Sequence, residues 1–264
     1  MNLRIFQIDA FTSEAFGGNP AAVMPLDCWL EDDLLQAIAM ENNLSETAFL
    51  VPRGNDFELR WFTPATEVDL CGHATLASAH VLYQHLDYAG GEICFHTRSG
   101  ELRVTQASER YTLDFPAYAL SNGEMNMSVS DALGLTASEV VDVQGAGKQL
   151  HVFEFEEDVA GLNPDFSALR AATNNCIIAT APGDNCDFVS RFFGPPVGID
   201  EDPVTGSAHC ALVPYWAGRL RQDRLSARQI SARGGELDCV FRAGRVAMSG
   251  QAVTFMQGQV NLPD

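Results

Sequence analysis

The segment Asp69-Leu70-Cys71-Gly72-His73-Ala74-Thr75-Leu76-Ala77-Ser78-Ala79-His80 leads from a polar, glycine-containing turn into a helix that is small or apolar nearly all the way round. A helix with so little polar surface is normally buried on every side. Its first turn offers unpaired backbone N–H groups and the positive end of the helix dipole, which together favour a bound anion. Cys71 and His73 stand at this helix start, and both side chains can transfer protons. The segment therefore predicts a buried central helix whose N-terminus belongs to a functional site.

The same pattern returns in the second half, in Asp202-Pro203-Val204-Thr205-Gly206-Ser207-Ala208-His209-Cys210-Ala211-Leu212. A polar turn with a glycine again enters a helix of small residues, and Pro214 inside that helix predicts a kink or a break. Shorter pieces also recur in the same order, namely Phe49-Leu50-Val51 with Arg60-Trp61-Phe62, and Ile177-Ile178-Ala179 with Arg191-Phe192-Phe193. A buried helix in each half, with reactive groups at its start, predicts a duplicated fold with one site between the halves.

Most of the remaining chain consists of short apolar or alternating segments bounded by turn residues, which is typical of strands. Sheets wrapped around one central helix per half explain why strands outnumber helices, so we expect an α+β fold of two similar domains. Pro116 and the polar stretch 120–125 mark the boundary. The sequence thus predicts a domain of residues 1–118 with its central helix from about 72, and a domain of residues 119–264 with its helix from about 206. The prediction allows the last few residues to pack in the first domain.

The composition, with 46% apolar and 19% charged residues in 264, is that of a globular protein. A formal net charge of −19 argues against nucleic acid or an anionic membrane as partner, because both reward Lys and Arg. No apolar run approaches the length of a transmembrane helix, and the N-terminal residues do not resemble a signal peptide. Seven scattered cysteines without a C-x-x-C pair are typical of a reduced, cytoplasmic protein.

Neither a metal nor a cofactor is expected. A zinc site built from Cys71, His73, His209 and Cys210 is conceivable, but the spacings fit no usual ligand motif. Neither the G-x-G-x-x-G nor the Walker pattern of nucleotide-binding loops occurs. Cofactor-free chemistry is therefore predicted.

The reactive side chains assigned to the site are Glu46, Cys71, His73, Asp202 and Ser207. Two positive helix ends directed at one cavity favour a small carboxylate-bearing substrate. A carboxylate base beside a second acid/base group suits the removal and return of a proton. Proton transfer on a small carboxylic acid is therefore the predicted reaction.

Three other functions stay open from the residues alone. Ser207, near Gly206 and His209, suggests a hydrolase, but the G-x-S-x-G nucleophile elbow is absent. Cys71 as a thiol base predicts a racemase or epimerase of the two-cysteine kind, although the second helix start carries Thr205-Gly206-Ser207 instead of a matching cysteine. A non-catalytic small-molecule binder would also keep such a site.

Nearly the whole chain carries short motifs whose combination is specific. In order they are Asp9-Ala10-Phe11-Thr12, Gly18-Asn19-Pro20-Ala21-Ala22-Val23, Leu44-Ser45-Glu46-Thr47-Ala48-Phe49, Arg60-Trp61-Phe62-Thr63-Pro64, Glu67-Val68-Asp69-Leu70-Cys71-Gly72-His73-Ala74-Thr75, Glu201-Asp202-Pro203-Val204-Thr205-Gly206-Ser207-Ala208, and Gly250-Gln251-Ala252-Val253 with Gly258. Together these motifs resemble those of the phenazine-biosynthesis PhzF-like isomerases.

The resemblance implies a diaminopimelate epimerase-like fold of two pseudo-symmetric domains, each a β-barrel-like sheet around a central helix. It also implies cofactor-independent isomerisation by proton relocation in a homodimer, with the active site between the domains. Carried over by motif, Glu46 is the catalytic acid/base, and His73 and Asp202 hold and polarise the substrate. The further substrate contacts implied are Asn19, Ser45, Gly72, Gly206 and Ser207, the two glycines through their backbone N–H groups. Cys71 departs from the phenazine-pathway pattern and matches the epimerase relatives, which leaves an epimerase open.

Overall fold

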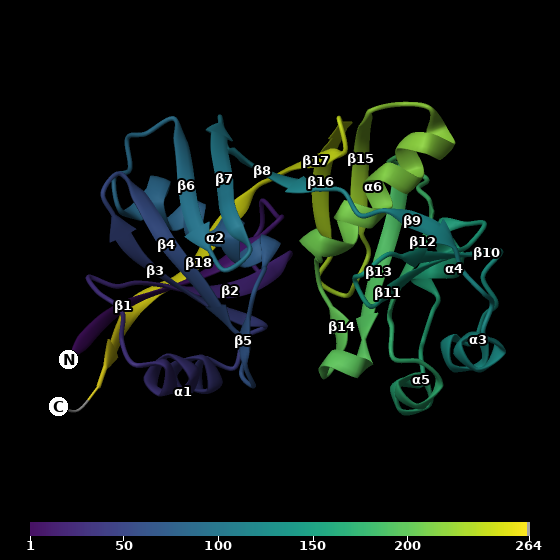
Figure 1. Ribbon diagram of the computed structural model, residues 1–264, viewed down its shortest axis with the longest axis horizontal. Helices are drawn as coiled ribbons and strands as arrows, with labels where there is room; N and C mark the ends of the chain where they lie inside the picture. The colour runs from purple at the N-terminus through teal and green to yellow at the C-terminus, as the bar shows by residue number, and fades with distance from the viewer. Residues whose placement is uncertain (263–264) are drawn as a thin grey trace. The chain divides into compact units, whose positions relative to one another are not determined.

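The computed structural model describes residues 1–262 (Figure 1). Contacts divide the chain into two compact units. The first unit comprises Met1–Asp114 and the segment from Ser249 onward, and the second comprises Phe115–Met248. Among the residues described, no helix has both the length and the apolar character that crossing a membrane requires.

The first unit is a mixed sheet with two helices. Its strands are β1 (Asn2–Ala10), β2 (Asn19–Pro25), β3 (Glu46–Arg53), β4 (Asp56–Phe62), β5 (Glu67–Val68), β6 (Glu92–Thr97), β7 (Gly100–Ala107), β8 (Arg110–Pro116) and β18 (Ala252–Asn261), and its helices are α1 (Asp32–Asn42) and α2 (Gly72–His85). Every residue of α2 from Gly72 to Leu82 is buried, as its uninterrupted small and apolar surface predicts. Helix α1 instead buries one face, through Leu35, Ile38 and Ala39, and carries acidic residues in its first turn.

The second unit repeats this plan with extra short helices. Its strands are β9 (Leu120–Asn122), β10 (Glu139–Val143), β11 (Lys148–Val152), β12 (Cys176–Pro182), β13 (Phe188–Gly194), β14 (Ile199–Asp202), β15 (Arg224–Gln229), β16 (Gly235–Arg242) and β17 (Arg245–Gly250). Its helices are α3 (Met127–Leu133), α4 (Glu156–Ala160), α5 (Phe166–Ala172), the 3-10 turn η1 (Pro195–Val197) and α6 (Gly206–Leu220). Residues of α3, α4 and α5 form one apolar core with β12 and β13.

Strand pairing shows that the two units share one topology. In the first, β1 and β2 are antiparallel, β2 and β3 parallel, β3 and β4 antiparallel, β4 and β6 parallel, and β6 and β7 antiparallel. In the second, neighbouring strands pair in the order β10, β11, β12, β13, β15 and β16. These five pairs are again antiparallel, parallel, antiparallel, parallel and antiparallel. The central helices α2 and α6 occupy equivalent places, after β5 and β14. This α+β fold with two pseudo-symmetric halves is the predicted one.

The register corrects one detail of the proposed repeat. Phe49 lies opposite Arg60 in the first unit, and Ala179 lies opposite Arg191 in the second. Phe49 therefore corresponds to Ala179, two residues beyond the Ile177 to which the sequence comparison matched it. The same register places Cys176 at the position equivalent to Glu46, so the second unit has no carboxylate there.

Of the kink or break predicted at Pro214, the break does not occur, because α6 runs through this residue without interruption. A proline removes the hydrogen bond to the carbonyl four residues earlier, which is that of Cys210. In this chain the backbone N–H of Tyr118 donates to the Cys210 carbonyl at 3.0 Å. The orphaned acceptor is thus satisfied from outside the helix, and the helix continues.

The C-terminal segment returns to the first unit over more than a few residues. Strand β18 pairs antiparallel with β1 from Asn2 opposite Asn261 to Ala10 opposite Ala252. The return starts at Ser249, and the first unit gives way to the second at Asp114. The second unit is therefore a contiguous segment lying between two parts of the first along the chain.

Candidate functional site

Glu46 and His73 form a close pair in the first unit. Glu46 opens β3 and His73 is the second residue of α2. The His73 Nε2 atom lies 3.1 Å from Glu46 Oε2, and the side chains are only 5% and 13% exposed. The parallel pairing of β2 with β3 places Ala21 beside Glu46, so the starts of both strands lie at one edge. The N-terminus of α2 reaches the same edge.

Asn19 and Cys71 complete this cluster around the imidazole ring. The side-chain amide nitrogen of Asn19, at the start of β2, lies 3.2 Å from His73 Nδ1. The Cys71 sulfur lies 3.5 Å from the same ring nitrogen. Four residues selected from the sequence, Asn19, Glu46, Cys71 and His73, are therefore brought together.

The charges in this cluster are coupled. Burial of the imidazole opposes its protonation, but its contacts with Cys71 and Glu46, hydrogen bonds included, outweigh burial and hold the pKa of His73 well above its usual value. Burial first, and the Glu46 carboxylate second, raise the pKa of the Cys71 thiol to about 11, against a smaller opposing effect of His73. The thiol therefore stays protonated near neutral pH. The raised pKa of His73 favours a protonated ring in its contact with Glu46.

Both central helices begin without a side-chain cap. The N-cap residues Cys71 and Thr205 have extended backbones and make no capping hydrogen bond. In each helix a side chain one turn later bonds to the N-cap carbonyl: Thr75 donates from Oγ1 at 2.5 Å, and His209 Nδ1 lies 2.9 Å from the Thr205 oxygen. A helix start without a side-chain cap is the type of end at which first-turn N–H groups can bind an anion, so the carboxylate contacts predicted at Gly72 and Gly206 stay a prediction.

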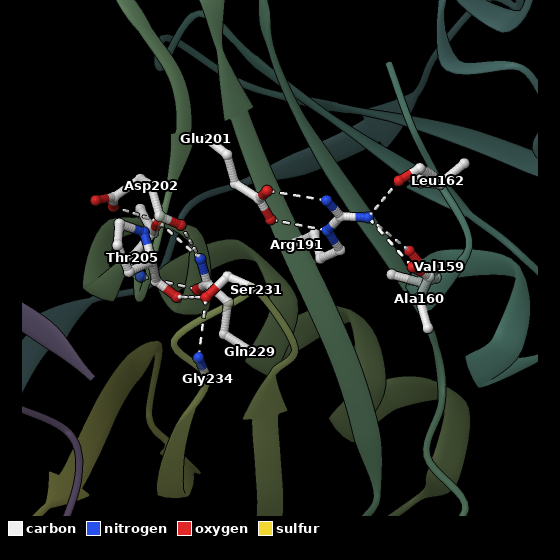
Figure 2. A network of polar contacts seen from close by, with 11 residues as sticks. Val159, Ala160, Leu162, Arg191, Glu201, Asp202, Thr205, Gln229, Ser231 and Gly234 are labelled. Atoms are coloured by element: carbon white, nitrogen blue, oxygen red, sulfur yellow. Dashed lines mark hydrogen bonds and ion pairs between the residues drawn. The ribbon is translucent and has the colours of Figure 1, made fainter. Parts of the chain in front are cut away.

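Asp202 and the start of α6 are held by a network that no local sequence pattern predicts (Figure 2). Gln229, at the end of β15, accepts from the Thr205 N–H at 2.8 Å and donates to the Asp202 carbonyl at 2.7 Å. The Thr205 hydroxyl donates to Asp202 Oδ2 at 2.5 Å. The same turn is braced by the Ser231 hydroxyl, which donates to the Pro203 carbonyl at 2.8 Å. A single glutamine in a strand carries no local signal for such a role.

A matching ion pair supports the strand that precedes each central helix. Arg60 contacts Glu67 through Nε and a terminal nitrogen at 2.8 and 2.7 Å. Arg191 contacts Glu201 in the same two-pronged way at 2.7 and 2.9 Å (Figure 2). Arg191 also donates to the Leu162 carbonyl at 2.6 Å. Bidentate arginine–carboxylate pairs hold both side chains in a defined orientation. Each pair therefore positions the strand, β5 or β14, that precedes a central helix.

The other predicted site residues make fewer contacts. Ser45 and Ser207 are half-buried, and Gly72 and Gly206 are buried at the helix starts. His209 and Cys210, considered for a zinc site with Cys71 and His73, bond to backbone oxygens of their own helix start, at Thr205 and Gly206.

We expect Gln229→Leu to lower the free energy of unfolding by about 2–4 kcal/mol, because it removes the two buried hydrogen bonds that Gln229 makes with the Thr205 N–H and the Asp202 carbonyl. Urea unfolding followed by circular dichroism measures the change. Gln257→Leu, at an exposed position of β18, is the matched control and should change stability by less than about 0.5 kcal/mol. Equal effects of the two substitutions would refute the assigned role of Gln229.

Comparison with known proteins identifies relatives of this chain. A family model described as phenazine biosynthesis-like protein matches residues 8–258. An uncharacterized isomerase of Pseudomonas aeruginosa is 52% identical over 99% of this chain and 100% of its own. A phenazine biosynthesis protein of the PhzF family from Enterococcus faecalis superimposes with a TM-score of 0.95 at 46% identity, covering 99% of this chain and 100% of the other.

A more distant structure, a predicted epimerase from Pseudomonas aeruginosa, shares the fold with a TM-score of 0.74 at 20% identity, covering 99% of this chain and 100% of its own. The epimerase-like fold expected from the motifs is therefore confirmed. The motif resemblance, the family model and the full-length relatives agree, and the chain belongs to the phenazine biosynthesis-like, PhzF-type family.

Proposed function

We propose that this protein is a cofactor-independent isomerase that moves a proton between carbons of a small carboxylate-bearing substrate, with Glu46 as general acid/base. The observation that carries the proposal is the buried contact of 3.1 Å between Glu46 and His73 beside an uncapped helix start. The name isomerase given to the relative that is 52% identical supports the reaction class.

The proposed reaction needs one carboxylate that both takes and returns a proton. Glu46 Oε2 lies 3.1 Å from His73 Nε2. In the proposal, Oε1 accepts the proton from a substrate carbon while the electron pair moves into the adjoining unsaturated system. The same proton is then delivered to a different carbon, so the substrate is isomerised without net gain or loss. His73 orients the carboxylate and offers an acidic N–H as charge develops.

The epimerase alternative assigns the base to Cys71, and two features weigh against it. Its thiol has a pKa raised to about 11, so little thiolate is present near neutral pH. The equivalent N-cap position of α6 is Thr205, which cannot act as a second thiol. The Glu46 carboxyl group lies 3.1 Å from the same ring, so we assign proton abstraction to Glu46.

The remaining assignments are part of the proposal. Asp202 is the further polar catalytic residue, and the substrate contacts are Asn19, Ser45, Gly72, Gly206 and Ser207. Homodimer formation and a cytoplasmic location are expected from the family resemblance and the cysteine pattern. Nucleic acid is not an expected partner for a chain with a net charge of −19.

The reaction class is tested by solvent-deuterium incorporation. Small cyclic and amino-acid-derived carboxylates are incubated with the protein in D₂O, and their C–H positions are followed by NMR. We expect incorporation into at least one acid, and Cys71→Ser should retain it within about tenfold, because the thiol is not the base. Loss of exchange in Cys71→Ser would favour the epimerase, and binding of an acid without exchange would favour a non-catalytic binder.

A further inference from the structure

A second cluster of reactive side chains lies in the first unit on β4 and β6. Asp56, Cys94 and His96 each offer one ligand atom, and these atoms all lie within 4.8 Å of one another. The closest pair is His96 Nε2 and Asp56 Oδ2, at 3.1 Å. None of these residues belongs to the motifs or to the proposed catalytic cluster.

The strand register explains why the three side chains share one face. Strands β4 and β6 are parallel neighbours with Phe57 opposite Phe95, which places Asp56 beside Cys94. Cys94 and His96 are two residues apart on β6 and therefore point the same way. The intervening Phe95 is fully buried in the core. Asp56, Cys94 and His96 consequently gather on the opposite face of the sheet, where Cys94 is buried and the other two side chains reach solvent.

The neighbouring strand supplies a support for the histidine ring. His96 Nδ1 lies 3.9 Å from Glu101 Oε1, on β7. The other oxygen of Glu101 is held by Arg103 at 3.1 Å, and Arg103 also contacts Glu92 at 2.6 Å. A histidine that binds a metal through one nitrogen usually directs its other N–H at a carboxylate, which fixes the ring and its tautomer. Glu101 is placed for that role once Nε2 turns to a metal.

We propose that Asp56, Cys94 and His96 form a binding site for a divalent transition metal of the zinc class. Thiolate, imidazole and carboxylate are the three donor types of protein zinc sites, with bonds of about 2.0–2.3 Å. Tetrahedral geometry then requires ligand atoms about 3.3–3.6 Å apart, which side-chain rotations reach from the observed arrangement. This inference does not depend on the proposed isomerase activity.

Charge and access suit such an ion. On binding, the Cys94 thiol releases its proton to the buffer, and the thiolate and Asp56 carboxylate together neutralise a charge of +2. The side chains of His96 and Asp56 are 23% and 42% exposed, so the ion can enter from solvent and keep water as its fourth ligand. The chain's net charge of −19 also raises the local concentration of cations.

The test uses Co²⁺ as a coloured substitute for zinc. The full chain is freed of metal with a chelator and titrated with Co²⁺, and the thiolate-to-cobalt absorption band is recorded. We expect saturation near one equivalent, displacement by Zn²⁺, and release of one proton from the thiol per ion. Cys94→Ser should abolish the band, and His96→Gln should weaken binding at least tenfold.

A matched control is built into the chain, because Glu46, Cys71 and His73 form a cluster of the same donor types. Cys71→Ser should leave the band intact, as should Cys28→Ser at an exposed cysteine. Absence of a band in the wild-type chain, its persistence in Cys94→Ser, or its loss in Cys71→Ser would each overturn the proposal. If Cys94→Ser does not fold, the test relies on His96→Gln. Undiminished Co²⁺ affinity in that variant would also overturn the proposal.

Discussion

Glu46→Gln should reduce the rate of substrate proton exchange by about 10²–10⁴-fold, the range that a positioned acid/base group contributes. The amide is nearly the same size as the carboxylate, so its oxygen can keep the place of Glu46 Oε2, 3.1 Å from His73 Nε2. An amide does not take up a proton near neutral pH, so binding is retained while abstraction from carbon is lost. The initial rate of deuterium incorporation into an exchanging acid measures the effect.

The matched control for this substitution is Glu58→Gln in the same unit. Glu58 is also a carboxylate that accepts from a ring N–H, that of Trp29, at 2.6 Å. If local disturbance of such a contact were enough to stop exchange, both variants would fail. Exchange at wild-type rate in a folded Glu46→Gln protein would contradict the proposed mechanism, whichever substrate is used.

His151→Leu is expected to stabilise the protein at pH 7 by about 1–3 kcal/mol, the penalty for a buried polar group without a hydrogen bond. His151 is 1% exposed on β11, and neither ring nitrogen has a hydrogen-bond partner among residues 1–262. Leucine fills a similar volume without polar atoms. Urea unfolding at pH 7 measures the gain.

The same substitution should flatten the loss of stability in acid. Burial lowers the pKa of His151 to about 4, whereas an unfolded histidine titrates near 6.5. Between these pH values the unfolded chain binds the extra proton, so the wild-type protein loses stability as the pH falls from about 6.5 to about 4. The cost approaches about 3 kcal/mol at the acid end. The difference between His151→Leu and wild type should therefore widen over this window.

His209→Leu separates the expected gain of stability at pH 7 from the expected change in the acid-dependent loss of stability. Burial also lowers the pKa of His209 to about 4, so its removal should likewise flatten the acid limb. Its Nδ1 lies 2.9 Å from the Thr205 carbonyl, however, and only its Nε2 has no hydrogen-bond partner among residues 1–262, so this variant loses a hydrogen bond and should gain less at pH 7 than His151→Leu. Parallel stability–pH curves for wild type and His151→Leu would show that this ring does not control the acid limb.

Local patterns were sufficient to predict the two central helices, whereas the roles of Glu46 and Asn19 beside His73 were expected from the motif resemblance. Small residues on every face specify burial, and the polar segments before Glu46 and Gly72 place reactive groups at element starts. Gln229 was not predicted, because its partners lie 24 and 27 residues earlier and no local pattern connects them. The two-residue offset between Phe49 and its counterpart also escaped the sequence comparison. Strands buried on both faces lack the alternation that fixes register.

The pairing of β18 with β1 sets an order on folding during synthesis. A ribosome releases the chain from its N-terminus, so one edge of β1 lacks its partner until the final residues emerge. The second unit is contiguous and is complete earlier, although it begins later along the chain. The half that contains Glu46 and His73 is therefore finished last, and a polypeptide truncated before β18 carries the catalytic cluster in a unit that has not closed.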